Sequence, residues 1–387
     1  MMCFMLALQR RHQLENKRKY HIIIGSKAFF DANLPEFAEE DDIDMFLELV
    51  KLSDSAKQNR RLFDQHADIL IIKNNNYNGI VDAAHDRLGP LIEDLTTDYA
   101  EIYVHNPPRV LMEYLEDQKK RALITLDVVS EKYEIKRDSN MFVNNIKEIS
   151  SNIFGQQTAI EEISKSLWSL TSVEREKPYV IMLYGNSSLG KTELVRQVAE
   201  KFFEGKCLEK HLSMFKNNNY SEYFFGDAPN RRSLGFDLLE GESNLIFFDE
   251  LDKCPEYFFS AFYTLFDNVQ FKDATYDVDV SGIVIVLTSN YHTEEEMQKL
   301  LGLPIFYRID KFIHFDDFDT DTIYEIVQNE ILVRKEEYED KLTPEMIYAA
   351  VSPLISISGE NARTIKYKVQ QVIEELLFQE IQDEKLI

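Results

Sequence analysis

Cysteine is scarce in this chain of 387 residues, which contains only three: Cys3, Cys207 and Cys254. An odd number of widely separated cysteines provides neither a disulfide framework nor the paired thiols of a zinc knuckle. Chains without disulfides are typical of reducing compartments. The cysteine content therefore predicts a cytoplasmic protein whose fold does not depend on disulfides.

Long apolar runs are also missing. No segment approaches the ~18 apolar residues that a membrane-spanning helix needs. The apolar start, Met1–Leu8, is short, and its positive charges follow the apolar residues instead of preceding them. That order is wrong for a secretory signal. We therefore expect a soluble protein without membrane association.

Positive charge is in deficit, with 43 lysines and arginines against 68 aspartates and glutamates, which gives a net charge of −25. Such a chain repels duplex DNA unless a basic patch is segregated on its surface. The single basic run, Gln9–Lys19, is better explained as a solvated helix face than as such a patch. We therefore do not expect nucleic acid to be a partner.

The length and a hydrophobic content of 44% predict two or three packed domains. In the first part of the chain, strand-like runs alternate with helical patterns, which favours an α/β domain with a parallel sheet. The expected strands are Tyr20–Ile24, Asp68–Ile72 and Glu101–Val104, and the expected helices are Leu47–Phe63, Asn78–Leu95 and Pro108–Tyr133. A charged stretch, residues 134–140, predicts the end of this domain, 1–140.

A second α/β domain is expected at 141–316, again with strands and helices in alternation. Its expected strands are Tyr179–Tyr184, Leu208–Met214, Asn244–Phe248, Gly282–Leu287 and Lys311–Phe315. The pattern then becomes helical, which predicts a small helical subdomain at 317–387. Its expected helices are Thr320–Lys335, Thr343–Ser352 and Glu360–Gln382.

The most informative segment is Tyr179–Thr192, an apolar strand followed by a glycine-rich loop and the start of a helix. It has the G-x-x-x-x-G-K-[ST] pattern, in which backbone N–H groups surround a phosphate chain. Lys191 would reach the β- and γ-phosphates, and Thr192 would hold Mg²⁺. The pattern predicts a nucleoside triphosphate site formed by Gly185, Asn186, Ser187, Ser188, Leu189, Gly190, Lys191, Thr192 and Glu193.

Two further apolar strands end in polar residues. Asn244–Glu250 ends in two acids, of which Asp249 can hold Mg²⁺ through water and Glu250 can polarise the attacking water. Gly282–Asn290 ends in an amide, and Asn290 can bond the attacking water or the γ-phosphate. Taken alone, the acids could be a solvated strand end and Asn290 a turn residue.

From Ile153 to about Leu377 the chain resembles the AAA+ ATPases, and within them the Clp chaperone branch, with torsins as relatives. Beside the phosphate-binding loop, the segments that carry the resemblance are Ile153–Ile160, Asp249–Pro255, Thr288–Asn290, Pro304–Asp310 and Asn361–Lys366. The resemblance implies a P-loop NTPase core with a parallel sheet and a C-terminal helical lid, with ATP and Mg²⁺ as cofactors.

The resemblance also implies roles for single residues. Ile153 and Phe154 would lie by the adenine, Glu250 and Asn290 would act on the attacking water, and Arg363 would be the second sensor. Arg308 would be an arginine finger that a neighbouring subunit supplies, which implies a homo-oligomeric ring or spiral of about six subunits. The alternatives are a surface ion pair for Arg308 and a lid-stabilising pair for Arg363.

The sequence departs from the Clp pattern in the loop that grips a threaded polypeptide. The corresponding region, Phe225–Phe236, lacks the expected Tyr-Val pair and carries Arg231, Arg232 and Leu234 instead. The interpretations that remain are weak gripping by Leu234 or Phe236, arginines that contact an acidic ligand, and a ring that moves no substrate. Remodelling of a protein substrate and a regulatory switch with a companion effector, as in bacterial defence systems, are therefore both open; a DNA loader is disfavoured by the net charge.

The first 140 residues resemble no family that we recognise. Polar residues follow the expected strands at Ser26, Asn74, His105 and Asn106, and further polar groups gather at Asp64–Asp68 and at His85–Asp86. These could be metal or catalytic groups, but caps, turns and solvated faces explain them as well. A module that selects partners for the ATPase is the preferred interpretation.

Overall fold

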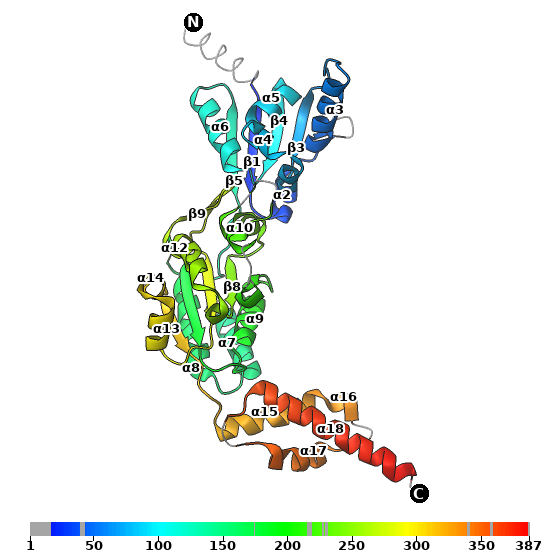
Figure 1. The fold of residues 1–387 in the computed structure, drawn as a ribbon, viewed down its shortest axis with the longest axis vertical. Coiled ribbons are helices and arrows are strands. Elements are labelled where there is room, and N and C mark those ends of the chain that lie inside the picture. The colour runs from blue at the N-terminus through cyan, green and yellow to red at the C-terminus, as the bar shows by residue number, and fades with distance from the viewer. Residues whose placement is uncertain are drawn as a thin grey trace. The chain divides into compact units, whose positions relative to one another are not determined.

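The computed structural model describes residues 17–38, 43–173, 175–214, 219–226, 228, 231–338, 341–356 and 359–385. The chain divides into two compact units. Figure 1 shows their helices and strands. The first unit contains residues 1–133, 216–244 and 268–281, and the second contains 134–215, 245–267 and 282–387. We call 216–244 and 268–281 the inserted segments. The apolar start and most of the basic run lie outside the described residues.

The first unit contains a five-stranded sheet with the order β2-β3-β4-β1-β5, in which every pair is parallel. Its strands are β1 (Lys19–Ile24), β2 (Ile43–Met45), β3 (Ala67–Ile72), β4 (Thr96–His105) and β5 (Thr125–Ser130). Its helices are α2 (Lys27–Asn33), α3 (Phe46–Gln58), η1 (Asn74–Gly79), α4 (Asp82–His85), α5 (Leu88–Leu95) and α6 (Arg109–Lys120).

The two faces of this sheet are covered by different helices. Alternate residues of a strand point to opposite faces. Ile22 of β1 packs in one core with Leu111 of α6 and with residues of α3 and α5. Its neighbour Ile23 packs in a separate cluster with Phe30 of α2. The helices α3, α5 and α6 therefore cover one face, and α2 covers the other.

The inserted segments form their own small structure in the first unit. They contain α10 (Asn219–Phe225), α11 (Leu234–Glu240) and an antiparallel hairpin of β9 (Gln270–Lys272) and β10 (Asp277–Asp279). The buried carboxylate of Asp273 accepts hydrogen bonds from Thr275 N at 2.7 Å, Tyr276 N at 2.6 Å and Ser233 Oγ at 2.6 Å. This one carboxylate shapes the hairpin turn and fastens the start of α11 to it.

The second unit contains a five-stranded parallel sheet with the order β12-β6-β11-β8-β7. Its strands are β6 (Tyr179–Tyr184), β7 (Leu208–His211), β8 (Leu245–Asp249), β11 (Val284–Thr288) and β12 (Lys311–His314). Its helices include α7 (Ser139–Asn152), α8 (Gln157–Leu170), α9 (Lys191–Phe202), α12 (Phe259–Asp267), α13 (Glu294–Leu301) and α14 (Leu303–Phe306). Short 3₁₀ turns are η2 (Leu212–Met214), η3 (Leu251–Lys253) and η4 (Glu256–Phe258).

The helices of the second unit also divide between the two faces. The helices α7, α8 and α9 pack on one face, in a core that contains Phe247 of β8. Phe248, the next residue, contacts Phe262 of α12 on the other face, with 5.4 Å between the ring centroids. The carboxyl ends of the parallel strands thus meet at one edge of a sheet that is buried on both sides.

The C-terminal helices pack around an apolar core of their own, which contains Val327, Ile347 and Val369. They are α15 (Thr320–Val333), α16 (Lys335–Tyr338), α17 (Pro344–Val351), η5 (Ser352–Leu354) and α18 (Ala362–Lys385). None of the helices in the described part of the chain has the length and apolar content needed to cross a bilayer.

The predicted fold class is confirmed, because two sheets of parallel strands and a helical C-terminal part are present. Two expected elements were wrong. The expected helix Asn78–Leu95 is divided into the end of η1, α4 and α5, and the expected helix Pro108–Tyr133 ends at Lys120, after which Thr125–Ser130 forms strand β5. Val128 and Val129 in this run have strong β propensity, and pairing with β1 satisfies the backbone. The sequence patterns also did not predict β2 or the hairpin of β9 and β10.

Candidate nucleotide-binding site

The phosphate-binding loop joins β6 to α9. Gly185 has φ +132° and Gly190 has φ +101°, and both conformations favour glycine. A Cβ atom at Gly185 would lie 2.4 Å from the carbonyl oxygen of Phe315, so no side chain fits there. Phe315 N in turn donates to Tyr184 O at 2.8 Å. The loop therefore starts where the end of β6 lies in close contact with Phe315, the residue that follows β12.

The ammonium group of Lys191 is buried within this loop. Its Nζ donates to Gly185 O at 2.7 Å and to Asn186 O at 2.6 Å, and it lies 3.4 Å from Asn290 Oδ1. Burial lowers the pKa of Lys191 to about 8, against the opposing effect of the Asp252 and Asp249 carboxylates. A positive charge is thus held where an anionic ligand would relieve its desolvation.

Asp249 ends β8 and is the centre of a group of hydroxyls. Its Oδ1 accepts a hydrogen bond from Thr192 Oγ1 at 3.3 Å and a short one from Thr288 Oγ1. Its Oδ2 lies 3.3 Å from Nδ1 of His211 at the end of β7. The first residues of α9 and the ends of three strands therefore meet at one carboxylate.

The donor set around Asp249 suits Mg²⁺. A hydroxyl of Thr192 and a carboxylate are hard oxygen ligands, and Mg²⁺ bound with phosphates needs only one or two of them from the protein. Across the described residues, no group of three or more His, Cys, Asp or Glu side chains could hold a metal ion by itself. Thr192 and Asp249 would hold Mg²⁺ together with the phosphates of a nucleotide.

Glu250 follows Asp249 in a left-handed conformation, with φ +60° and ψ +51°. A non-glycine residue in this region costs about 1–2 kcal/mol. The turn is held by Glu250 N, which donates to Thr288 Oγ1 at 3.0 Å. The hydroxyl of Thr288 thus ties both acids of the strand end to β11, and backbone strain of this kind is typical of functional sites.

Asn290 follows β11 and is oriented by Asp252. Asn290 N donates to Asp252 Oδ1 at 3.1 Å, and its Nδ2 lies 3.4 Å from Asp252 Oδ2. With its amide N–H₂ on that carboxylate, Asn290 presents its oxygen to Lys191. The structure therefore brings Lys191, Thr192, Asp249, Glu250 and Asn290 together at the carboxyl edge of the sheet, as the motifs predict.

The remaining loop residues have different surroundings. Asn186 Nδ2 donates to Asp317 Oδ1 at 2.7 Å, Leu189 is buried in the sheet core, and Ser187 is exposed. Ser188 has φ +61°, and its carbonyl accepts from Ala362 N at 3.2 Å. Glu193 Oε1 accepts from Gln197 Nε2 at 3.1 Å, one turn further along α9.

The segment that resembles the adenine side joins the sheet core and the C-terminal helices. Ile153 is buried in the core of α7, α8 and α9, and Phe154 packs on the core of the C-terminal helices. Gln156 Nε2 donates to Asp316 O at 2.9 Å. Arg363 is exposed in the first turn of α18, next to the residue that bonds the loop at Ser188. The role of Arg363 as a sensor stays a prediction.

Arg308 does not belong to the cluster around Lys191. Its guanidinium pairs with Asp267 at 3.1 Å, donates to Pro304 O at 2.6 Å and lies 5.2 Å from the ring centroid of Tyr263. The ion pair expected as the alternative is therefore formed within the chain. Action on the nucleotide of a neighbouring subunit stays a prediction.

Sequence reasoning missed three members of the site: His211, Asp252 and Thr288. Asp252 lies only two residues after Glu250, and Thr288 opens the Thr-Ser-Asn run, so their nearness to the motifs was a usable signal. His211 had no such signal. It reaches Asp249 because β7 and β8 are paired with His211 opposite Asp249.

The region that corresponds to the gripping loop is largely packed into the first unit. Leu234 is 0% exposed, and Phe236 lies 6.2 Å from the ring of Tyr276. Arg232 pairs closely with the buried Asp237, and Arg231 pairs with Glu222 at 3.1 Å. Three residues of this region, Asp227, Pro229 and Asn230, lie outside the described residues. The arginines thus contact acids of the chain itself.

Polar candidates of the first domain fall into two groups. Ser26, Asn74, His105 and Asn106 come together at the carboxyl edge of the first sheet and are all buried. The others do not form a site: Asp68 accepts from Thr97 Oγ1 at 2.8 Å, and His85 Nε2 lies 3.0 Å from Tyr77 O. A metal site at Asp64–Asp68 or at His85–Asp86 gains no support, because neither is part of a metal-binding group in the described residues.

The known proteins that this chain resembles match the part of it that contains Lys191, Asp249 and Asn290. The family model of the AAA domain (Cdc48 subfamily) matches residues 176–382. Similar proteins include the mitochondrial disaggregase of Homo sapiens, 25% identical over 169 residues that cover 41% of this chain and 24% of that protein. The ATP-dependent protease ATP-binding subunit-like protein of Rhodococcus erythropolis is 25% identical over 232 residues, or 48% of this chain and 66% of that protein.

The chaperone protein ClpB of Yersinia enterocolitica is 23% identical over 172 residues, or 41% of this chain and 19% of that protein. The chain therefore spans about a quarter of the disaggregase and a fifth of ClpB. The family model itself covers more than half of the 387 residues. The protein thus belongs to the AAA domain family (Cdc48 subfamily), and its C-terminal part is a Clp-type AAA+ ATPase.

Proposed function

We propose that this ATPase remodels or unfolds protein partners as a ring of about six copies. The observation that carries the proposal is the cluster of Lys191, Thr192, Asp249, Glu250 and Asn290 at one sheet edge, which provides what phosphoryl transfer requires. The domains would be 1–140 for recognition, 141–316 for ATP binding and 317–387 as the lid. The cysteine content supports a cytoplasmic location.

In this proposal each residue of the cluster has one task. Lys191 neutralises charge on the β- and γ-phosphates, and Glu250 polarises the attacking water with help from Asn290. Thr192 and Asp249 would hold Mg²⁺, which would supply positive charge to offset the charge of the phosphates. Arg363 of the same copy and Arg308 of a neighbouring copy would stabilise the charge that develops in the transition state. Hydrolysis would then depend on assembly, because the Arg308 that acts on each nucleotide comes from the next copy.

A second candidate is a regulatory switch, in which ATP assembles a scaffold that presents the first domain to a companion effector. The packing of the gripping-loop region favours it. Leu234 is 0% exposed and Phe236 contacts Tyr276, so neither is free to hold a polypeptide without rearrangement. The two candidates share ATP binding and assembly and differ in whether a protein substrate passes through the ring.

One experiment tests the proposal and separates the two candidates. We expect wild-type protein to hydrolyse ATP and to form rings with ATP. Lys191→Ala should hydrolyse ATP at least 100-fold more slowly and should not form rings with ATP. In a motor, Phe236→Ala should slow partner remodelling about tenfold while the exposed lid substitution Phe378→Ala does not. Equal remodelling by both variants favours the switch. An assembled protein without turnover above the Lys191→Ala level contradicts the motor, and a protein that neither binds ATP nor assembles contradicts both candidates.

The pKa of Lys191 predicts a pH dependence of ATP affinity. Without nucleotide this pKa is about 8, and bound phosphates should raise it, so binding takes up a proton above that pH. The affinity should be flat below about pH 7 and fall by up to about tenfold per unit above pH 8. Calorimetry in two buffers of different ionisation heat would measure the proton. Lys191→Arg, which does not titrate, should show no such decline; an equal decline in both contradicts the assignment.

A further inference from the structure

At the centre of the first sheet, the connections that follow two neighbouring strands leave on opposite faces. The neighbouring strands β1 and β4 both lead into helices, but the helices lie on opposite faces: α2 follows β1, and α6 follows β4. Where neighbouring parallel strands send their connections to opposite faces, a crevice opens beyond their carboxyl ends, and ligands of open α/β sheets bind there.

The strand ends at this point are held by buried polar groups. His105, the last residue of β4, places Nε2 2.8 Å from Gly25 O, and Asn106 Nδ2 donates to the same oxygen at 2.9 Å. Asn106 Oδ1 accepts from Gly25 N at 2.9 Å. His105 and Asn106 are 2% and 1% exposed. Burying an imidazole and an amide together is costly unless both are used, so this is a built site and not a solvated edge.

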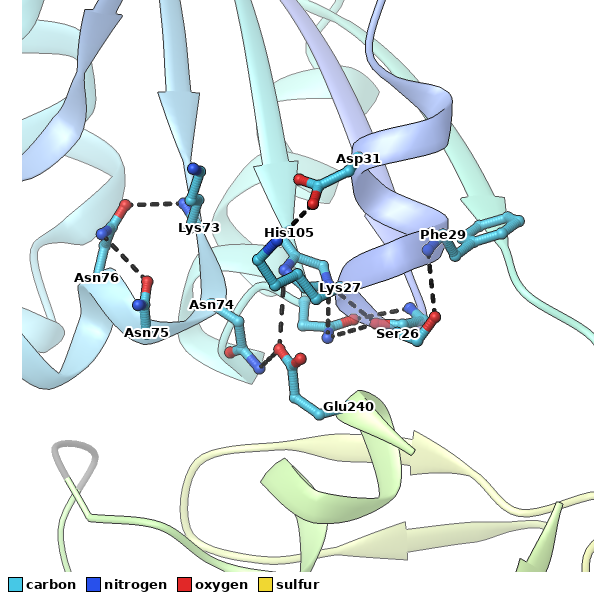
Figure 2. Close-up of polar contacts among 12 residues, drawn as sticks. Ser26, Lys27, Phe29, Asp31, Lys73, Asn74, Asn75, Asn76, His105 and Glu240 are labelled. Atoms are coloured by element: carbon cyan, nitrogen blue, oxygen red, sulfur yellow. Dashed lines mark hydrogen bonds and ion pairs between the residues drawn. The ribbon is translucent and has the colours of Figure 1, made fainter. Parts of the chain in front are cut away.

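A carboxylate from the inserted segments enters this site. Glu240, the last residue of α11, accepts from Asn74 Nδ2 at 2.7 Å with its Oε1, which also lies 3.7 Å from His105 Nδ1 (Figure 2). Asn74 is fixed in turn by the hydroxyl of Tyr276, which donates to Asn74 Oδ1 at 3.0 Å. The positive charge of Lys27 acts on Glu240 and on His105. An amide and an imidazole thus lie close to one carboxylate.

Two other carboxylates nearby already have donors of their own. Asp31 pairs with Lys27 Nζ at 2.5 Å, and Glu131 Oε2 accepts from Ser26 N at 2.7 Å. Among the described residues of the first domain, none accepts from the Asn74 amide; its Nδ2 donates instead to Glu240, 166 positions away. Of these three carboxylates, Glu240 is therefore the one that comes from outside the first domain's own sequence and accepts from one of its amides.

We propose that this crevice binds the phosphate or carboxylate group of a small organic ligand, and that Glu240 is the intramolecular occupant of its anion position. Ligand and Glu240 cannot both be there, so binding displaces the end of α11. Gly241 and Asn244 link that end directly to β8, which carries Asp249. If the proposed ATPase function is correct, ligand binding would thereby affect the hydrolytic site through the chain segment that joins α11 to β8.

A cavity that could hold the rest of the ligand lies at the ends of the same strands. It has a volume of about 290 Å³, and its lining includes Ile24 at the end of β1, Asn106 directly after β4, and Leu239, which precedes Glu240. Charged residues of the lining are Arg109, Glu113, Glu116 and Asp277. In the described part of the chain, Asp277 Oδ1 is buried without a hydrogen-bond partner. A hydroxyl or amine of the ligand would satisfy it, which favours a small phosphorylated or carboxylated metabolite with such a group.

The test removes the occupant and asks whether the site accepts an anion. Binding of inorganic phosphate and of acetate is measured by equilibrium dialysis at constant ionic strength, in a Lys191→Ala background so that the phosphate-binding loop does not contribute. We expect Glu240→Ala to bind phosphate, acetate or both at least tenfold more tightly than the background protein. Preference between the two probes distinguishes a phosphate ligand from a carboxylate ligand.

Matched variants make the result decisive. Glu36→Ala, which removes an exposed carboxylate of the same unit, should not change binding, and Asn74→Ala added to Glu240→Ala should abolish the gain. Glu240→Gln keeps an oxygen for Asn74 and guards against misfolding of the alanine variant; it should bind about threefold more tightly, because the competing charge is gone. If neither Glu240 variant binds phosphate or acetate better than Glu36→Ala, the proposal is overturned, whatever the ATPase activity.

Discussion

Glu250→Gln should bind ATP with nearly wild-type affinity and hydrolyse it 100- to 1000-fold more slowly, on the order of what a general base contributes. The amide has the shape of the carboxylate but cannot polarise water. Because Gln and Glu pay the same cost at φ +60°, the turn held by Thr288 should persist. A trapped ATP state should also hold the assembly together and retain protein partners, which can be identified by mass spectrometry after capture with ATP.

A matched control separates the loss of the carboxylate from an effect on the backbone. Glu204 is exposed, also has a positive φ of 56°, and lies outside the cluster around Lys191. Glu204→Gln should therefore hydrolyse ATP at the wild-type rate and melt at the same temperature as Glu250→Gln. Single-turnover measurements with radiolabelled ATP would compare the chemical steps. Hydrolysis by Glu250→Gln within about threefold of the wild-type rate would remove Glu250 from the mechanism.

The ATP site could be predicted because its information is local. Gly185, Lys191 and Thr192 lie within one strand–loop–helix segment, and Asp249 and Asn290 each follow an unbroken apolar run. Parallel strands in one sheet end at the same edge, so separate runs of this type define one site. Asp252 was missed although it lies only two residues after Glu250, because nothing in the sequence says which way its carboxylate points.

The first domain could be predicted only in part, for a physical reason. Its central strands have strong apolar patterns, but Thr125–Ser130 is a strand because β1 offers it a parallel partner more than a hundred residues away. The contact between Asn74 and Glu240 spans 166 positions. Such pairings depend on tertiary structure, which overrides local propensity. The same non-local contacts explain why the inserted segments fold with the first unit and not with their sequence neighbours.

Gly185→Ala should disrupt the nucleotide site more than any other alanine substitution of a loop glycine. Its Cβ would meet Phe315 O at 2.4 Å, a backbone atom that cannot turn away, and its φ of +132° disfavours any side chain. Phe315 also leads directly to Asp316 and Asp317, which bind Gln156 and Asn186. Pushing this segment away therefore displaces both the phosphate-binding loop and the start of the chain that enters the C-terminal helices.

Gly282→Ala is the control, because Gly282 also has a positive φ, +69°, but has no atom within 4 Å of the added Cβ. It should cost only the conformational strain, about 1–2 kcal/mol, and leave ATP affinity unchanged. Gly185→Ala adds a steric clash with fixed backbone, so we expect ATP affinity to fall at least 100-fold together with a lower melting temperature. Titration calorimetry and thermal melting of both variants measure this difference. Equal ATP affinity in the two variants would show that the loop does not need its close approach to Phe315, and that the contact with β12 plays no part in forming the site.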